Sequence, residues 1–133
     1  MAPLERCVGG IAYDDLGRLL LIRRGHEPGK GLWSLPGGRV EPGETDTEAV
    51  IRELREETGL HVTPHTPIGT VVRGHYEITD YECAVSPGPL TAGDDADDAR
   101  WTDSAELVAL HKAGLLTDQL FVTLRDWDAL PRT

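Results

Sequence analysis

The segment of residues 38–60 constrains the fold of this chain more than any other part of it. Thr45 and Asp46 are residue types that cap helix N-termini, and residues from about 47 to 58 are rich in helix formers. Gly59 stands where a left-handed C-cap would end such a helix. The sequence therefore predicts one sharply bounded helix inside this segment.

The predicted helix gathers its acidic side chains on one side. With a rotation of about 100° per residue, Glu53, Glu56 and Glu57 fall together. Carboxylates three and four residues apart repel one another, so helix stability alone does not favour this cluster. The opposite side collects the less polar residues Val50, Ile51, Leu54 and Thr58.

Two interpretations of the acidic cluster are open. A divalent cation would relieve the repulsion, and grouped carboxylate oxygens suit Mg2+, Mn2+ or Ca2+. Alternatively, the glutamates form a solvated helix face with pairs such as Arg52 with Glu56. The glycines Gly37 and Gly38 before the helix are either a plain turn or a loop that brings backbone carbonyls close to a bound ion. The glycine pair, the acidic cluster and the spacing between them together favour the interpretation that this segment binds a cation.

The spacing of the segment fits G-x5-E-x7-R-E-U-x-E-E-x-G-U, where U is a bulky aliphatic residue. Nine specified positions match, namely Gly38, Glu44, Arg52, Glu53, Leu54, Glu56, Glu57, Gly59 and Leu60. The segment resembles the signature of the Nudix hydrolases without a departure. The resemblance covers essentially the whole chain, so it implies one domain over residues 1–133 with an α/β/α sandwich around a mixed β-sheet.

The resemblance also implies roles for individual residues. It makes Glu53, Glu56, Glu57 and the carbonyl of Gly37 ligands of Mg2+, with Mn2+ as an alternative, and it gives Arg52 and Glu44 the task of orienting that shell. The implied reaction is hydrolysis of a phosphoric anhydride bond. Glu53 is the first candidate for the general base, and a carboxylate of a later loop is the second.

That later carboxylate is Asp95 or Asp98, with a slight preference for Asp98. Both lie in residues 93–101, which together with residues 24–33 resemble the branch called ADP-ribose pyrophosphatase-like. A solvated acidic loop is the alternative interpretation of either aspartate.

The substrate is less constrained. Many ADP-ribose hydrolases carry a proline sixteen residues after the signature, where this chain has Tyr76, and residues 117–121 resemble some triphosphate-cleaving members. We therefore expect a nucleoside diphosphate derivative, with an ADP-ribose-like substrate slightly favoured. Cleavage of (d)NTPs to a nucleoside monophosphate and pyrophosphate is the alternative. A non-catalytic nucleotide-binding regulator is a distant third.

Three side chains are candidates for substrate binding. Arg23 and Arg39 offer bidentate donors to phosphate, although surface arginines are commonplace. Strand alternation puts Tyr76 on one face with Ile78 and Asp80, where its ring either stacks on a base or packs in the core. Of the three tryptophans, Trp33 either stacks on a base or packs in the core, and Trp101 and Trp127 are expected in the core.

Composition limits the partners. A formal net charge of −10 over 133 residues disfavours nucleic acid backbones and anionic membranes. The two cysteines, Cys7 and Cys83, form no disulfide or zinc pattern, and no apolar run reaches transmembrane length. We expect a cytoplasmic enzyme, and the family resemblance makes a homodimer plausible.

Hydrophobic periodicity and turn residues place the remaining elements. Strands are expected over residues 6–13, 18–24, 32–35, 61–73, 76–85 and, briefly, 100–101, with a loop over residues 87–99. Helices are expected over residues 104–111 and 117–130.

Overall fold

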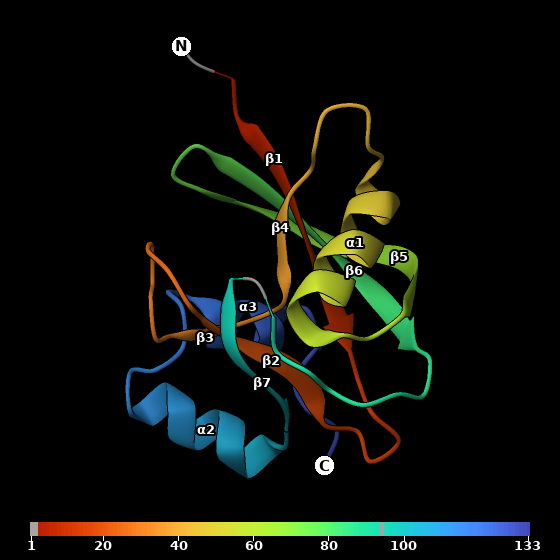
Figure 1. Ribbon diagram of the computed structural model, residues 1–133. Coiled ribbons are helices and arrows are strands. Elements are labelled where there is room, and N and C mark those ends of the chain that lie inside the picture. The colour runs from red at the N-terminus through yellow and green to blue at the C-terminus, as the bar shows by residue number, and fades with distance from the viewer. Residues whose placement is uncertain (1–2, 94) are drawn as a thin grey trace.

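The computed structural model describes residues 3–93 and 95–133 (Figure 1). Within these ranges the elements are β1 (Glu5–Ala12), β2 (Leu19–Arg24), β3 (Trp33–Ser34), β4 (Gly37–Arg39), α1 (Asp46–Thr58), β5 (Val62–Arg73), β6 (Tyr76–Val85), β7 (Ala96–Thr102), α2 (Ser104–Lys112) and α3 (Leu120–Asp126). No helix in the described ranges is long and apolar enough to cross a membrane.

The strands form two sheets. The larger is mixed, in the order β4-β1-β6-β5, with β1 parallel to β6 and the other pairs antiparallel. The smaller is antiparallel, in the order β3-β2-β7. The α/β fold class is confirmed, although the strands divide between two sheets. They divide because β4 and β6 occupy both edges of β1, so that β2 pairs instead with β3 and β7.

Helix α1 has the bounds that its capping signals predict. Thr45 Oγ1 accepts a hydrogen bond from the Glu48 N–H at 3.2 Å, and Glu48 Oε1 accepts one from the Thr45 N–H at 2.9 Å. This reciprocal capping box satisfies two N–H groups that the helix itself leaves unpaired. At the other end, Gly59 adopts a φ of 75°, which only glycine enters without strain.

Replacing Thr45 with alanine should therefore lower the free energy of unfolding by about 1 kcal/mol, because the Glu48 N–H loses its acceptor. For a domain of this size the melting temperature should fall by roughly 3–5 °C. The control is Thr47→Ala, which makes the same chemical change inside the helix, where alanine is favoured, and keeps both capping bonds. Equal melting temperatures for the two variants would contradict the capping role.

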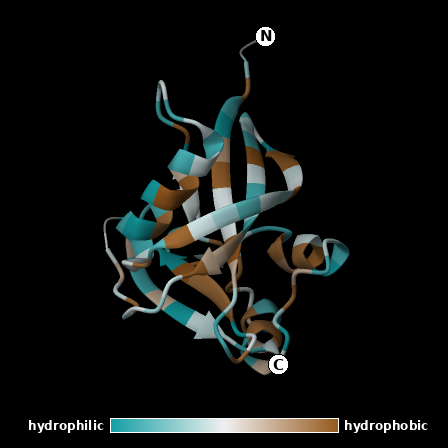
Figure 2. Ribbon diagram, turned by 90° about the vertical axis from the view of Figure 1, so that its right-hand side faces the viewer, coloured by the Kyte–Doolittle hydropathy of each residue, from teal (hydrophilic) through white to brown (hydrophobic). Residues whose placement is uncertain are grey.

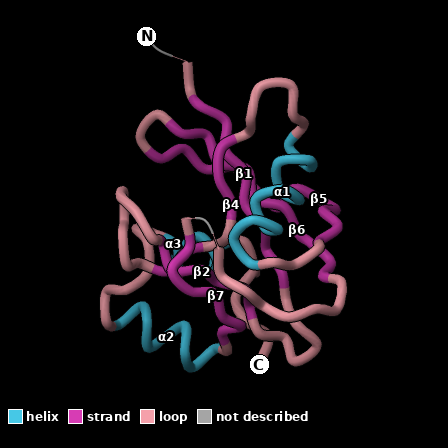
Figure 3. Tube along the Cα trace, viewed as in Figure 1, coloured by secondary structure: helices cyan, strands magenta, loops and turns pink. Residues whose placement is uncertain are grey.

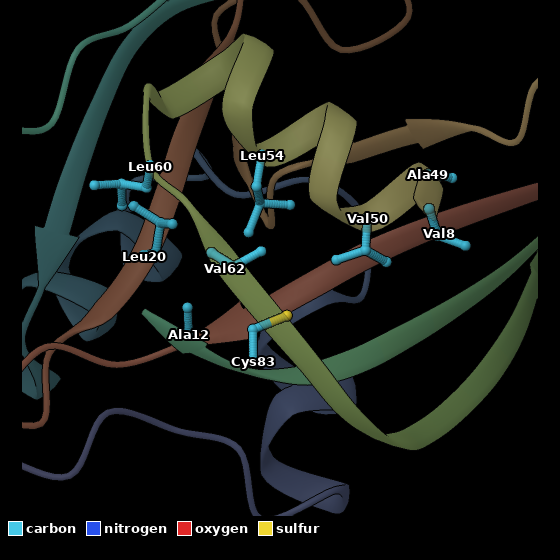
Figure 4. Packing of buried hydrophobic residues seen from close by; sticks show 9 residues of the cluster. All are labelled: Val8, Ala12, Leu20, Ala49, Val50, Leu54, Leu60, Val62 and Cys83. Carbon is cyan, nitrogen blue, oxygen red and sulfur yellow. The ribbon is translucent and has the colours of Figure 1, made fainter. Parts of the chain in front are cut away.

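One face of α1 packs on the larger sheet. Its side chains Ala49, Val50 and Leu54 point toward Val8, Val62 and Cys83, as Figure 4 shows. The approach is close at Gly10 of β1, where an added Cβ would lie 2.8 Å from Leu54 Cδ2. On the side predicted to be less polar, Ile51 is 40 % exposed and does not join this core. Glu57, on the acidic side, is only 5 % exposed.

A second core fills the other side of the larger sheet. Ile11 of β1, Leu19 and Leu21 of β2, and Leu124 of α3 are buried there together with Trp33, which is 3 % exposed. The packing interpretation of Trp33 is thus confirmed. Hydrophobic and hydrophilic bands alternate along the long strands, as expected for strands that face different surroundings (Figure 2).

Three elements depart from the sequence expectations (Figure 3). The glycine pair forms the edge strand β4, in which Gly37 and Gly38 lie opposite Gly9 and Val8. Strand β7 begins at Ala96, inside the expected loop. Helix α3 fills only part of residues 117–130, because Gln119 just before it has a left-handed φ of 62°.

Candidate active site

A cleft of about 950 Å³ opens on the face of the larger sheet that points away from α1. Strand alternation separates the two faces. Val8 of β1 faces the core under α1, whereas its neighbour Gly9 faces the cleft, in register with Gly37 of β4 and Asp80 of β6. The opposite wall comes from β2, residues 26–36 and the start of α3, which include Arg24 and Leu120.

Two carboxylates of α1, those of Glu53 and Glu57, reach the cleft at the edge strand β4. The Gly37 N–H donates a hydrogen bond to Glu57 Oε1 at 2.7 Å. The Glu53 carboxylate lies so close to Gly38 that an added Cβ there would be 2.5 Å from its Oε1. The glycine pair therefore lets the backbone approach both carboxylates. That the carbonyls of this segment lie close to a bound ion stays a prediction.

Burial governs the protonation of these two acids. It raises the pKa of Glu57 to about 8, against the opposing effect of the hydrogen bond from Gly37. Burial also raises the pKa of Glu53, while the nearby Arg52 guanidinium opposes the rise. Two desolvated acids side by side make a site that a cation would stabilise.

Arg52 fixes the carboxylates around it. Its Nε and Nη2 donate to both oxygens of Glu44, at 2.8 and 3.0 Å, and its Nη1 donates to Glu53 at 2.9 Å. Hydrogen bonds from Arg52 lower the pKa of Glu44 to about 2. Arg52 also forms an ion pair with Glu56, with 3.3 Å between Nη1 and Oε2. Arg52 thus links Glu44 to Glu53, and the orienting role of Arg52 and Glu44 toward a metal stays a prediction.

The donor set fits a hard divalent cation. Carboxylate oxygens of Glu53, Glu56 and Glu57 and the backbone carbonyls of β4 are the ligand types that Mg2+ and Mn2+ take. In the part of the chain that the structure describes, no three acidic, histidine or cysteine side chains converge on one point. The three glutamates do not converge because Glu57 accepts a hydrogen bond from the Gly37 N–H, whereas Glu53 and Glu56 form ion pairs with Arg52.

Only two of the three predicted substrate-binding residues lie in the cleft. Arg39 and Tyr76 line the cleft, with the Arg39 guanidinium 5.9 Å from the Tyr76 ring centroid. Arg23 instead lies over Trp33, at 5.8 Å from its ring, and Arg24 takes the place on the cleft wall. Alternation along β2 puts Ile22 and Arg24 on the cleft wall and Arg23 on the other side of the strand.

Of the two candidate aspartates, only Asp95 lines the cleft. Asp95 lines the cleft, 3.3 Å from the His26 ring, and its charge contributes to raising the pKa of Glu53 and Glu57. Asp98, the preferred candidate, lies within β7 opposite Arg23, and its Oδ1 accepts a hydrogen bond from the next backbone N–H. The structure therefore places Asp95, and not Asp98, beside the carboxylates of α1.

Arg73 and Asp80 are charged residues of the cleft, besides Arg24, to which the sequence analysis assigned no role. Arg73 of β5 lines it and donates a hydrogen bond to Thr123 at 3.3 Å. Asp80 of β6 lines it as a buried acid. Alternation along β6 already placed Asp80 on the same face as Tyr76, which was the available signal.

Known proteins resemble this chain over most of its length. A family model described as the NUDIX domain matches residues 3–123. An ADP-ribose pyrophosphatase of Methanocaldococcus jannaschii is 42% identical over 109 residues, which cover 77% of this chain and 64% of that protein. The human 8-oxo-dGDP phosphatase NUDT18 is 48% identical over 64 residues, covering 48% of this chain and 20% of that protein. The chain thus spans less than two thirds of either relative.

The fold agrees with this relationship. The crystal structure of a MutT protein from Methanosarcina mazei Go1 matches with a TM-score of 0.76 at 23% identity, over 95% of this chain and 94% of that one. Such a match at low identity speaks for the fold alone. Since the family model extends over residues 3–123, the chain belongs to the Nudix family of hydrolases.

Proposed function

We propose that this chain is a divalent-metal-dependent pyrophosphohydrolase that cleaves the diphosphate linkage of an ADP-ribose-like nucleoside diphosphate derivative. The observation that carries the proposal is the position of the buried Glu57 and the partly buried Glu53, which lie against β4 at the edge of a cleft of about 950 Å³. Clefts of roughly 300–1,000 Å³ are typical of small-molecule sites.

The metal ligands we propose are Glu53, Glu56, Glu57 and the Gly37 carbonyl, with Mg2+ as the ion and Mn2+ as the alternative. Divalent ions bound there would neutralise phosphate oxygens and lower the pKa of an attacking water. Nudix hydrolases generally use divalent metals, and a bound cation would stabilise a buried carboxylate such as that of Glu57.

The chain's own residues supply binding and proton transfer. Arg24, Arg39 and Arg73 put three guanidinium groups on the cleft walls, where they can receive an anionic diphosphate. Glu53 is our general base, because burial raises its pKa toward the working range of a base while Arg52 fixes its orientation. Asp95 is the second candidate for that role.

The named relatives guide the substrate. The archaeal ADP-ribose pyrophosphatase matches 77% of this chain, and the human 8-oxo-dGDP phosphatase matches 48% of it. The broader match supports an ADP-ribose-like substrate, with oxidised or ordinary nucleoside di- and triphosphates as the second candidate. A single domain, a cytoplasmic location and homodimer assembly stay predictions of the sequence.

Product analysis by chromatography tests the proposal. The purified chain should convert ADP-ribose to AMP and ribose 5-phosphate with Mg2+, and chelation should abolish turnover. Nucleoside triphosphates and 8-oxo-dGDP serve as competing substrates at equal concentration. Release of a nucleoside monophosphate and pyrophosphate from a triphosphate, with ADP-ribose intact, would transfer the assignment to triphosphate cleavage. Absence of turnover on every substrate would contradict an enzymatic role and favour the nucleotide-binding regulator.

A further inference from the structure

Arg73 of β5 stands at the end of the cleft floor that is farthest from the proposed metal site. One row of residues across the larger sheet marks the metal end, because it contains Gly37, whose N–H donates to Glu57. Followed from β4 to β5 through the strand register, this row consists of Gly37, Gly9, Asp80 and Gly69. Arg73 lies four residues beyond Gly69 on β5, which is about 13 Å at the rise of a β-strand.

The part of the cleft floor between these two ends is uncharged. It is formed by Cys7 of β1, Ile78 of β6 and Val71 of β5, which lie side by side in register and line the cleft. Arg39 adjoins them at the β4 edge, and its charge is balanced by Glu5, with 3.4 Å between Nε and Oε2. The middle of the cleft therefore suits the uncharged part of a nucleotide, and Arg73 lies beyond it.

Arg73 is a partly buried cation without an acidic partner in residues 3–93 and 95–133. Its Nη1 donates to the Val72 carbonyl at 3.1 Å, and its Nη2 donates to Thr123 Oγ1 of α3 at 3.3 Å. Both acceptors are neutral. Asp118, the acid of the facing wall that lies just before α3, forms no ion pair with it. The bond to Thr123 therefore holds the guanidinium across the cleft while its positive charge stays unbalanced.

Such a guanidinium favours an anionic ligand over a neutral one. The edge of a base can accept hydrogen bonds from Arg73, but it leaves the positive charge unbalanced. A phosphate group accepts two parallel hydrogen bonds from the fork of an arginine, and these charge-assisted bonds are about twice as strong as neutral ones. Because the scissile diphosphate is expected at the metal end, the anion at Arg73 has to be a second group on the substrate.

We propose that Arg73, positioned by Thr123, binds a second phosphate group of the substrate, a monoester on the ribose of the nucleoside, and so selects nucleotides that carry one. The inference rests on the proposed function and narrows its substrate class to phosphorylated nucleoside diphosphate derivatives. A phosphate on the 2′ oxygen and one on the 3′ oxygen offer the same chemistry, and the experiment distinguishes them.

Calorimetric titration with AMP, adenosine 2′,5′-bisphosphate and adenosine 3′,5′-bisphosphate, in the presence of Mg2+, tests the inference without any turnover. The wild type should bind one of the bisphosphates at least about tenfold more tightly than AMP, and the preferred isomer identifies the phosphorylated oxygen. Arg73→Gln should bring the ratio of the two affinities close to one. Arg73→Lys should keep part of the preference, because it retains the charge without the fork. Thr123→Val removes the hydroxyl acceptor and should weaken the preference.

Arg125→Gln is the matched control, because Arg125 is an exposed arginine of α3 outside the cleft lining. It should leave the ratio unchanged. If Arg73→Gln does not fold, Arg73→Lys and Thr123→Val take its place, and the wild-type ratio decides by itself.

Equal affinities of the wild type for AMP and both bisphosphates would overturn the inference, as would an unchanged preference in a folded Arg73→Gln. ADP-ribose cleavage together with equal affinities would keep the proposed function and reject the second phosphate site. A bisphosphate preference without ADP-ribose cleavage would keep that site and reject the proposed substrate. No nucleotide binding at millimolar concentration would contradict both.

Discussion

Replacing Glu57 with glutamine should reduce turnover at least about a hundredfold while the fold is retained. The amide oxygen of glutamine can still accept the hydrogen bond from the Gly37 N–H, which the carboxylate accepts at 2.7 Å. What the variant loses is a carboxylate of the proposed metal site, and electrostatic stabilisation by a bound metal contributes several kcal/mol to catalysis.

The same variant should be at least as stable as the wild type at pH 7. Glu57 is 5 % exposed, and its burial raises the pKa to about 8, so an uncharged side chain of similar shape removes an unfavourable buried acid. Loss of activity together with unchanged or increased stability separates a functional role from a structural one. The measurements are steady-state turnover of ADP-ribose, thermal unfolding and Mn2+ titration.

Glu82→Gln provides the control, because it makes the same change of glutamate to glutamine at an exposed residue outside the cleft lining. Mn2+ affinity should fall in Glu57→Gln and stay constant in the control. Near-normal turnover in the double variant Glu53→Gln, Glu57→Gln, with the fold intact, would exclude these residues from the metal site.

Helix α1 was predictable because its signals are local. Thr45 and Gly59 bound the helix through hydrogen bonds and a φ angle that involve residues within a few positions of each end. The burial of Glu57 was not predictable from its own helix. It depends on Gly37, twenty residues earlier, which approaches only because β4 pairs with β1.

The substrate-binding candidates illustrate the same limit. Alternation correctly placed Tyr76, Ile78 and Asp80 on one face of β6, where the pairing with β1 is regular. Arg23 was chosen by residue type alone, and the structure puts Arg24 on the cleft wall in its place, because Ile22 and Arg24 share one side of β2. Residue type did not show which of two neighbouring arginines faces the cleft.

The second large effect concerns Asp80, whose replacement by asparagine should stabilise the protein in a pH-dependent manner. Burial raises the pKa of Asp80 from its ordinary 3.8 to about 7 in the folded state. Below pH 3.8 the carboxyl group is protonated in both states and imposes no pH-dependent difference. As the pH rises from 3.8 to about 7, folding must take up a proton that the unfolded chain has released, so the wild type loses stability over this range.

Asparagine has nearly the same shape and does not ionise in this range, so the variant lacks that loss. The difference in free energy of unfolding between Asp80→Asn and the wild type should grow from pH 4 to pH 7 and then level off, by on the order of 2–4 kcal/mol. Urea denaturation at intervals between pH 4 and pH 8 measures it. Other titrating groups, including Glu57, are common to both proteins and cancel in the comparison. Parallel stability curves would contradict a raised pKa of Asp80 in the folded protein.

A stabilised Asp80→Asn protein would also bear on why the chain keeps the aspartate. A carboxyl group that lowers stability at neutral pH and finds no partner among the described residues is not explained by folding. Sites of function commonly retain groups that are unfavourable for stability. A gain of stability in the asparagine variant at neutral pH would show that the chain keeps this carboxyl group at a cost in stability.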